Sequence, residues 1–240
     1  MINPMISFWK RIKKYKNDFL LRKKYCSGGR PPFFKLAGEY LPKNKEAVII
    51  DVGCGDGSFA DYLDLRNSYS NVFLLDGNKK TVENVEGANF YRVPDRLNFE
   101  DNSVEYIHCS HMIEHLKSDD LFVFLKEIDR VLKKNGILVI SAPLLWSRFY
   151  DDLTHVRPYS EQVFINYLCK DRKNASIEKK LNLYRVKDLA YRYKVVPPED
   201  GIESSFFVID VLIKFIKIVF FKLGFKKYIK NGYTLVLKKI

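Results

Sequence analysis

The sequence of 240 residues predicts an α/β protein with a mostly parallel sheet covered by helices on both faces. Two observations predict this class. Short apolar runs alternate with amphipathic, helix-like stretches through the middle of the chain, a pattern typical of parallel sheets with crossover helices. The first apolar run, at residues 48–50, ends in a turn with glycine at alternate positions: Gly53, Gly55 and Gly57. Glycine is needed where the backbone adopts a positive φ or closely approaches a ligand.

The remaining elements follow from periodicity and from the positions of glycine and proline. Before the sheet we expect helices over residues 1–25 and 33–41, joined by the turn-rich linker SGGRPP. Strands are expected over residues 47–52, 72–76, 88–92, 104–109, 136–142, 184–196 and 232–239. Helices are expected over residues 58–66, 79–85, 119–134 (with Gly136 as its C-cap), 159–169 and 206–221. Residues 143–158 are expected to form a loop.

The glycine turn opens onto the N-terminus of a helix, which favours an anionic or carboxylate-bearing ligand. The next strand ends in Asp76, nineteen residues after Gly57, where a carboxylate can accept hydrogen bonds from ribose hydroxyls. That spacing alone also suits NAD. However, a dinucleotide fingerprint needs glycine at the position of Ser58, whereas D-x-G-x-G-x-G, starting at Asp51, resembles motif I of the class I S-adenosylmethionine (SAM) methyltransferases.

The resemblance continues downstream and covers roughly residues 45–160. LNFEDNSVEY at residues 97–106 and IHCSHMIEHL at 107–116 look like segments of methyltransferases that modify small molecules, lipids and sugars. This resemblance to the methyltransferases implies a Rossmann-like, seven-stranded, mostly parallel sheet that ends in an antiparallel hairpin. It also implies SAM as the cofactor. The residues that we expect at the cofactor are Asp51, Gly53, Cys54, Gly55, Gly57, Asp76, Gly77, Asp95, Arg96, Ser110 and His111.

The loop after the expected strand 136–142 is rich in charged and aromatic residues, and loops of this length often cover a site. It resembles the D-x-x-H-x-R segment of methyltransferases that act on polysaccharides and lipid-linked glycans, which implies that Asp152 and His155 face the acceptor. Since the pKa of a histidine can lie near neutrality, His155 is the candidate general base, and Asp152 would orient it or bind a sugar hydroxyl. The candidate substrate contacts are Arg148, Arg157 and Tyr159.

Residues 111–115 read HMIEH and match a metalloprotease pattern, H-x-x-E-H. They directly follow a strand in the cofactor-binding half, so we expect His111 to border the methyl donor and expect no metal site.

The net charge of +12 is concentrated at the two ends of the chain. Residues 1–25 and residues 206–240 each carry +7, which leaves −2 for the rest. We expect a basic amphipathic helix and linker over residues 1–30, and a methyltransferase domain over residues 31–240 with an apolar helix inserted at about 204–224. The apolar run of sixteen residues would span roughly 24 Å, less than the ~30 Å hydrocarbon core. A helix in the membrane interface fits better; packing on its own domain and an oligomer contact remain alternatives.

The four cysteines are far apart and show no zinc or disulfide spacing. With no apolar signal segment, the expected setting is cytoplasmic, with peripheral contact at the inner membrane face.

The favoured function is O-methylation of a sugar in a glycan or lipid-linked saccharide. Alternatives are a quinone or lipid methyltransferase, an RNA methyltransferase suggested by the basic ends, or a SAM-binding protein without turnover. Nucleic acid is the less favoured partner because no RNA-binding module is recognisable.

Overall fold

The computed structural model describes residues 4–26, 29–169, 183–196 and 204–240, and the side chains from residue 12 onward. The chain divides into two compact units, which are described separately. The larger unit comprises Gly29–Tyr191 and Gly232–Ile240, and the smaller unit comprises Met1–Gly28 and Arg192–Asn231.

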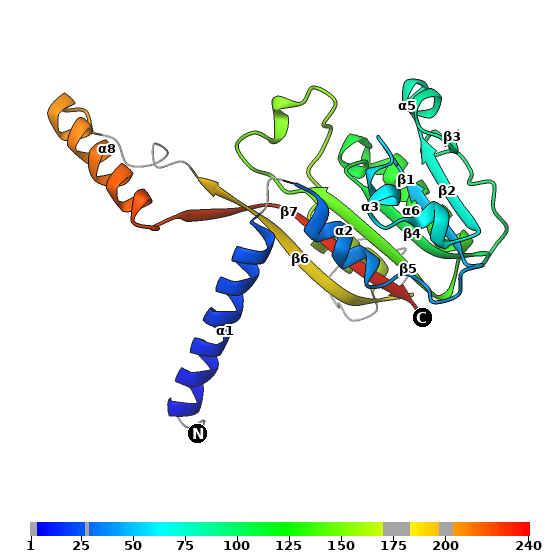
Figure 1. The fold of residues 1–240 in the computed structure, drawn as a ribbon, viewed down its shortest axis with the longest axis horizontal. Helices are drawn as coiled ribbons and strands as arrows, with labels where there is room; N and C mark the ends of the chain where they lie inside the picture. Colours follow the sequence, from blue (N-terminus) through cyan, green and yellow to red (C-terminus); the bar gives the residue numbers. More distant parts are fainter. Residues whose placement is uncertain (1–3, 27–28, 170–182, 197–203) are drawn as a thin grey trace. The chain divides into compact units, whose positions relative to one another are not determined.

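The larger unit is built on a sheet with strand order β3-β2-β1-β4-β5-β7-β6 (Figure 1), although the end of β6 after Tyr191 and the start of β7 before Gly232 belong to the smaller unit. The strands are β1 (Val48–Val52), β2 (Asn71–Asp76), β3 (Ala88–Phe90), β4 (Val104–Ser110), β5 (Leu132–Pro143), β6 (Tyr184–Val196) and β7 (Lys227–Lys239). Strands β1 to β5 pair in parallel, and β7 pairs antiparallel to β5. The predicted fold class, with a mostly parallel sheet of seven strands and antiparallel strands at the C-terminal end, is confirmed.

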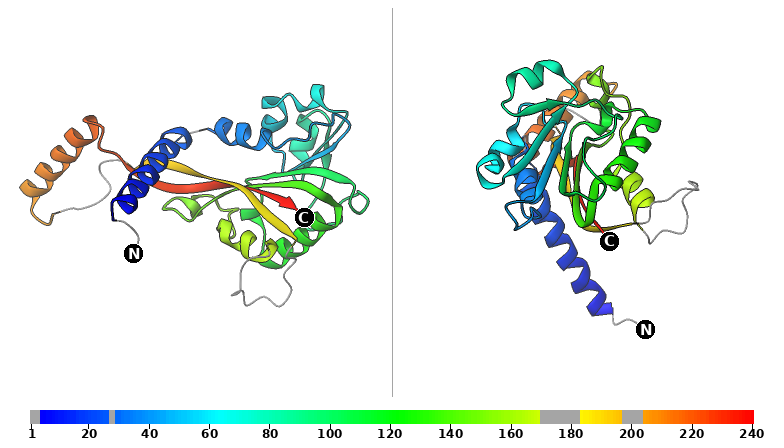
Figure 2. Two further views of the ribbon diagram at one scale, coloured as in Figure 1. Left: turned by 90° about the horizontal axis from the view of Figure 1, so that it is seen from below. Right: turned by 90° about the vertical axis from the view of Figure 1, so that its right-hand side faces the viewer.

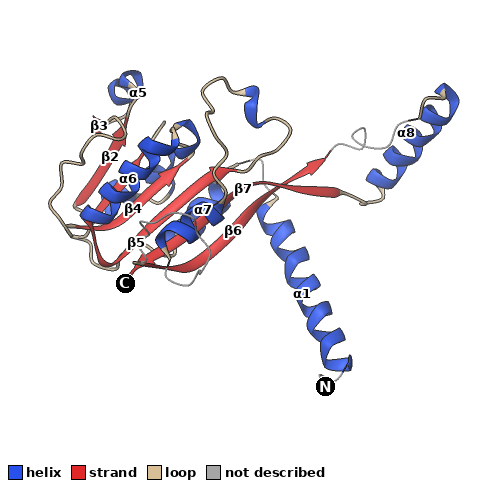
Figure 3. Cartoon of the chain, turned by 180° about the vertical axis from the view of Figure 1, so that it is seen from behind, coloured by secondary structure: helices blue, strands red, loops and turns tan. Residues whose placement is uncertain are grey.

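Helices cover both faces of this sheet (Figures 2 and 3). They are α2 (Pro31–Gly38), α3 (Ser58–Tyr62), α4 (Leu65–Ser68), α5 (Lys79–Asn84), α6 (Ser118–Val131) and α7 (Glu161–Leu168). Ile49 packs in one apolar layer with residues of α2, α3 and α4, whereas Ile50 packs in the other layer with residues of α6 and α7. A central parallel strand is apolar on both faces for this reason.

Most predicted helices differ from the structure by one to three residues at an end, for example α2, which spans Pro31–Gly38 and not 33–41, and for two helices the difference has a structural cause. The helix expected over 58–66 is divided into α3 and α4 because Asp64 adopts a left-handed conformation, with φ of 51°. The helix expected over 119–134 ends at Val131. Strand β5 begins at Leu132, so Gly136 lies inside a strand and is not a C-cap. Tertiary pairing with β4 has overridden the helical pattern of residues 132–134.

The smaller unit contains α1 (Pro4–Tyr25) and α8 (Phe207–Lys222). Residues 1–3 of the first predicted helix lie outside the described residues, as do the side chains of Phe8 and Trp9. No residue of α8 is buried. None of the helices within the described ranges is long and apolar enough to cross a membrane. The predicted domain boundary at residues 30 and 31 stays a prediction.

Arg130 holds the loop after β3 against α6. Its guanidinium donates to both carboxylate oxygens of Glu127, to Asp101 and to the backbone carbonyls of Leu97 and Phe99. Glu127 in turn accepts a hydrogen bond of 2.8 Å from the Leu97 amide. The hydrogen bond from Arg130 is the main cause of a lowered pKa at Glu127.

Replacing this guanidinium should destabilise the fold. Arg130→Met is expected to lower the free energy of unfolding by about 2–3 kcal/mol, since it leaves several acceptors without their donor. Because the folded-state pKa of Glu127 lies below its ordinary value of 4.5, the stabilisation is present above that pH and is lost as the pH falls through the folded value. Urea unfolding at pH 7 and at decreasing pH below 4.5 measures both effects. Lys126→Met, on the exposed face of the same helix, is the control and should change stability little.

Candidate functional site

The site lies where the order of the strands reverses. β1 is flanked by β2 on one side and by β4 on the other, and the carboxyl ends of all three strands reach the same edge. In open α/β sheets, ligands bind in the crevice at such a switch point. A cavity of about 550 Å³ lies here, within the range typical of small-molecule sites. Six of the predicted cofactor residues line it: Gly53, Gly55, Asp76, Gly77, Ser110 and His111.

The end of β2 fixes the glycine loop. The amides of Gly53 and Cys54 both donate to the carbonyl of Leu75, at 2.8 and 3.1 Å. The Gly55 amide donates to Oδ2 of Asp76 at 3.0 Å, and the Asn78 amide donates to Oδ1 at 2.8 Å. A carboxylate oxygen can accept more than one hydrogen bond, so Asp76 retains acceptor capacity toward the cavity.

The glycines of this loop have different requirements. Gly53, with φ of 74°, leaves no room for a side chain, since a Cβ atom there would lie 2.8 Å from Cβ of Met112. At Gly55, with φ of 54°, a Cβ atom would meet nothing within 4 Å among the described residues, and this residue lines the cavity. The loop therefore leaves open space on the side where a ligand would approach the backbone.

Asp51 lies beneath the loop and does not line the cavity. It is 1% exposed, and its Oδ1 lies 2.7 Å from Nδ1 of His108, the residue opposite it in the register of β1 and β4. The ring of His108 stacks on Phe59, with centroids 3.6 Å apart. The structure thus gives Asp51 a buried partner that holds β1 against β4, and a cofactor contact by Asp51 stays a prediction.

Four other predicted cofactor residues also lie away from the cavity lining. Cys54 is buried, and burial together with the neighbouring carboxylates raises the pKa of its thiol to about 12. Gly57 precedes the first residue of α3 in a left-handed conformation. The carbonyl of Asp95 accepts a hydrogen bond from the hydroxyl of Tyr91 at 2.7 Å. Arg96 lines a separate hollow with residues 97–101 and Arg130.

The loop over residues 144–160, here called the acceptor loop, is attached to the segment that follows β4. This segment contains the 3-10 helix η1 (Ile113–His115). The backbone carbonyl of Glu114 accepts hydrogen bonds from the amides of Val156 and Arg157 at 2.8 and 3.1 Å. The hydroxyl of Tyr159 donates to the carbonyl of Leu116 at 3.0 Å. These contacts hold the C-terminal part of the acceptor loop beside the cavity, which Thr154 also lines.

His155 is held in one orientation within this loop. Its Nδ1 lies 2.6 Å from the carbonyl oxygen of Phe149, so Nδ1 carries the proton and a neutral ring presents Nε2 as an acceptor. Its Nε2 is 3.9 Å from Oδ2 of Asp152. Asp152 accepts hydrogen bonds from the amide and hydroxyl of Thr154, and these contacts lower the pKa of its carboxyl.

The predicted substrate residues lie on the same loop but point to different partners. Arg148 forms an exposed ion pair with Asp151 at 2.7 Å. Arg157 donates to the hydroxyl of Ser118 at 2.9 Å. Tyr159 is buried, so its contact with a substrate stays a prediction.

The cavity also contains residues that sequence reasoning did not identify. Asn78, Thr81, Tyr91 and Arg92 all line it. Asn78 could have been found from its place two residues after Asp76, since its side chain caps α5 by accepting from the Lys80 amide at 3.0 Å. Tyr91 and Arg92 follow a short edge strand, and no motif marks them.

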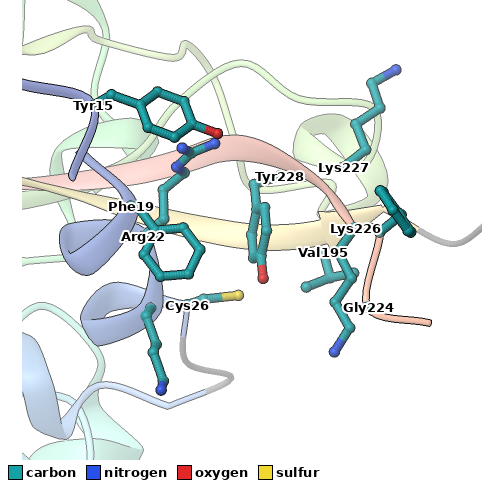
Figure 4. A pocket seen from close by; sticks show the side chains of 11 residues that line it. Tyr15, Phe19, Arg22, Cys26, Val195, Gly224, Lys226, Lys227 and Tyr228 are labelled. Carbon is teal, nitrogen blue, oxygen red and sulfur yellow. The ribbon is translucent and has the colours of Figure 1, made fainter. Parts of the chain in front are cut away.

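A second cavity, of about 900 Å³, lies within the smaller unit (Figure 4). Aromatic and basic side chains line it together: Tyr15, Phe19, Arg22, Lys23, Lys226 and Tyr228. The guanidinium of Arg22 lies 5.8 Å from the ring centroid of Tyr15 and 6.0 Å from that of Tyr228.

Comparison with known proteins places these features in context. A family model described as "Methyltransferase domain" matches residues 50–140. Two proteins of Arabidopsis thaliana are similar in sequence. "Uncharacterized methyltransferase At2g41040, chloroplastic" is 25% identical over 189 residues, which are 72% of this chain and 49% of that protein. "Probable methyltransferase PMT16" is 30% identical over 173 residues, 62% of this chain and 27% of that protein. The chain thus spans about half the length of the first relative and about a quarter of the second.

Among solved structures, a SAM-dependent methyltransferase from Archaeoglobus fulgidus is similar in fold. It is 22% identical to this chain, with a TM-score of 0.58 over 92% of this chain and 99% of that protein.

Proposed function

We propose that this chain, a member of the class I SAM-dependent methyltransferases, methylates a hydroxyl of a sugar in a glycan or lipid-linked saccharide at a membrane surface. The observation that carries the proposal is the cavity at the ends of β1, β2 and β4, here called the donor cavity, with the glycine loop on one side and the acceptor loop on the other. The first loop suits the methyl donor and the second suits the acceptor.

The residues of the cavity fit SAM. The open space at Gly55 admits a ligand against the backbone. Asp76 retains acceptor capacity for ribose hydroxyls while its two oxygens brace the loop. Ser110 and His111, at the end of β4, would border the rest of the ligand. When bound, SAM supplies an electrophilic methyl group on a sulfonium sulfur, which leaves as a neutral thioether.

The protein then needs to position the acceptor and remove its proton. Positioning alone can supply several kcal/mol of the barrier. His155 is the proposed general base: because its Nδ1 proton is directed to the Phe149 carbonyl, Nε2 is free to accept the proton of the acceptor hydroxyl. Asp152 lies close enough to orient the ring or to bind a sugar hydroxyl. A base in this role typically contributes about 10²–10⁴-fold to the rate.

The smaller unit supports a lipid-linked acceptor. Large apolar residues of α8 are exposed on all sides, for example Phe207, Leu212 and Phe215. Asp210 and Lys214 form an ion pair of 2.9 Å on the one polar strip. An exposed apolar helix flanked by lysines is typical of a helix in the membrane interface. The basic and aromatic cavity beside α1 adds a place for the phosphate of an anionic lipid (Figure 4).

Loss of the Asp76 carboxylate should weaken the methyl donor. Asp76→Ala is expected to reduce SAM affinity about tenfold or more, because it removes both the ribose acceptor and the brace on the Gly55 amide. Calorimetric titration with SAM, S-adenosylhomocysteine and NAD measures this. Asp61→Ala, an exposed carboxylate on α3, is the matched control and should bind SAM as the wild type does. Binding of NAD alone would contradict the proposal.

The base role predicts a separation between turnover and binding. His155→Ala should lower methyl transfer about tenfold or more and leave SAM affinity unchanged, since the ring does not line the donor cavity. The assay follows labelled methyl groups from SAM into a fraction of lipid-linked saccharides. Leu153→Ala, at a fully exposed position of the same loop, should be neutral. Equal turnover in both variants would remove His155 as the base.

The membrane proposal predicts retention on anionic vesicles and not on neutral ones, since each Lys or Arg near an anionic surface adds about 1 kcal/mol. In flotation assays, the double variant Leu212→Asp/Phe215→Asp should lose most of this retention. Lys134→Glu, an exposed change in the larger unit, should keep it. If the double variant floats like the wild type, α8 does not contact the membrane.

A further inference from the structure

Two neighbouring side chains and a third from a distant part of the chain come together at the edge of the donor cavity. Glu114 and His115 belong to η1, and His155 comes from the acceptor loop. Each offers one ligand atom, and these atoms lie within 4.8 Å of one another. We propose that Glu114, His115 and His155 bind a divalent transition-metal cation of the Zn²⁺ class.

Glu114 is the first argument for a cation. The residue is 1% exposed, and neither carboxylate oxygen accepts a hydrogen bond from any residue within the described ranges. Nδ1 of His111 lies 3.2 Å from its Oε1, and this pair is an ion pair only when the imidazole is protonated. A buried carboxylate without hydrogen-bond donors is costly, and groups of this kind pair with a charge or coordinate a metal.

The two histidines are the second argument, because their backbone contacts orient the free ring nitrogens. Nδ1 of His115 lies 3.0 Å from the carbonyl oxygen of Thr154, and Nδ1 of His155 lies 2.6 Å from that of Phe149. A carbonyl only accepts, so each Nδ1 carries a proton, and the neutral form of each ring presents a lone pair at Nε2. Metal-binding histidines characteristically donate their other ring N–H to a carbonyl or carboxylate in this way.

The donor set indicates the class of cation. Two imidazoles and one carboxylate suit Zn²⁺ and neighbouring transition metals, whereas Mg²⁺ and Ca²⁺ prefer oxygen ligands. Donors about 2.1 Å from a tetrahedral ion lie about 3.4 Å apart, so side-chain rotations would have to bring atoms now within 4.8 Å of one another closer by up to about 1.4 Å. Three protein ligands leave a fourth position open, and the donor cavity, which His115 lines, lies beside it.

This site differs from the pattern that the sequence presents. HMIEH suggested a metalloprotease motif with His111 as a ligand, and we expected no metal. In the structure the third ligand is His155, which lies about forty residues beyond His115. The cation and a proton compete for Nε2 of His155, so the base role proposed above belongs to the metal-free protein. The metal proposal itself concerns binding and holds whether or not the chain transfers methyl groups.

The test is direct measurement of bound metal on the full chain. Protein stripped with a chelator is dialysed against Zn²⁺, and separately against Mg²⁺, and the bound metal is quantified. We expect one Zn²⁺ per chain, no comparable Mg²⁺ binding, and a thermal unfolding midpoint that rises with Zn²⁺ concentration. His155→Ala, in a loop, should keep the fold and lose Zn²⁺ affinity about tenfold or more. Glu114→Gln should likewise lose Zn²⁺ affinity, and circular dichroism verifies that this variant is folded.

Cys26→Ser is the matched control, because Cys26 is the one cysteine that is not buried and it lies in the smaller unit. Zn²⁺ affinity should be unchanged in this variant. Absence of Zn²⁺ binding by the wild type would overturn the proposal. So would binding that survives His155→Ala, or binding that Cys26→Ser abolishes, since either would place the metal elsewhere.

Discussion

The site depends on the hydrogen bonds by which the end of β2 holds the glycine loop. Leu75 and Asp76 together receive the amides of Gly53, Cys54 and Gly55. These amides lie in the turn after β1, so without the acceptors of β2 they would need hydrogen bonds from solvent. Because the acceptors belong to the neighbouring strand of the sheet, they hold the loop in place at the end of β1. The carboxylate of Asp76 fixes the loop and also lines the cavity. One side chain therefore both shapes the cavity and supplies a polar group to it.

The opposite side of the cavity depends on a different kind of contact. There the backbone carbonyl of Glu114 holds the acceptor loop through the amides of Val156 and Arg157. Since backbone atoms do this, the side chain of Glu114 remains available, and it lies where two imidazoles converge. His111 adopts a positive φ of 53° in the turn that leads to this segment. Such a conformation costs free energy in a non-glycine residue, which the hydrogen bond from the His111 amide to the Ser141 carbonyl, at 2.9 Å, helps to offset.

Much of the fold could be predicted from the sequence, because strand, turn and helix signals are local. The glycines and Asp76 are found for the same reason: their roles follow from spacing along one β-turn-α-β segment. The pairing of Asp51 with His108 could not be predicted, since it depends on the register between β1 and β4, which are more than fifty residues apart. The proximity of His115 and His155 could not be predicted either, since it depends on how the acceptor loop folds back against η1. The break at Asp64 is a backbone conformation that the helical pattern did not reveal.

The distribution of charge adds a constraint on the smaller unit. By sequence this unit carries +11 of the total of +12, so the unit that holds the donor cavity is nearly neutral. Concentrated like charge opposes compact folding. The exposed apolar residues of α8 also carry the free-energy cost of apolar surface in water. An anionic, partly apolar surface relieves both costs at once, because it screens the lysines and buries the aromatic rings. A membrane with anionic headgroups provides such a surface, whereas a nucleic acid would satisfy the charges and leave the apolar face of α8 exposed.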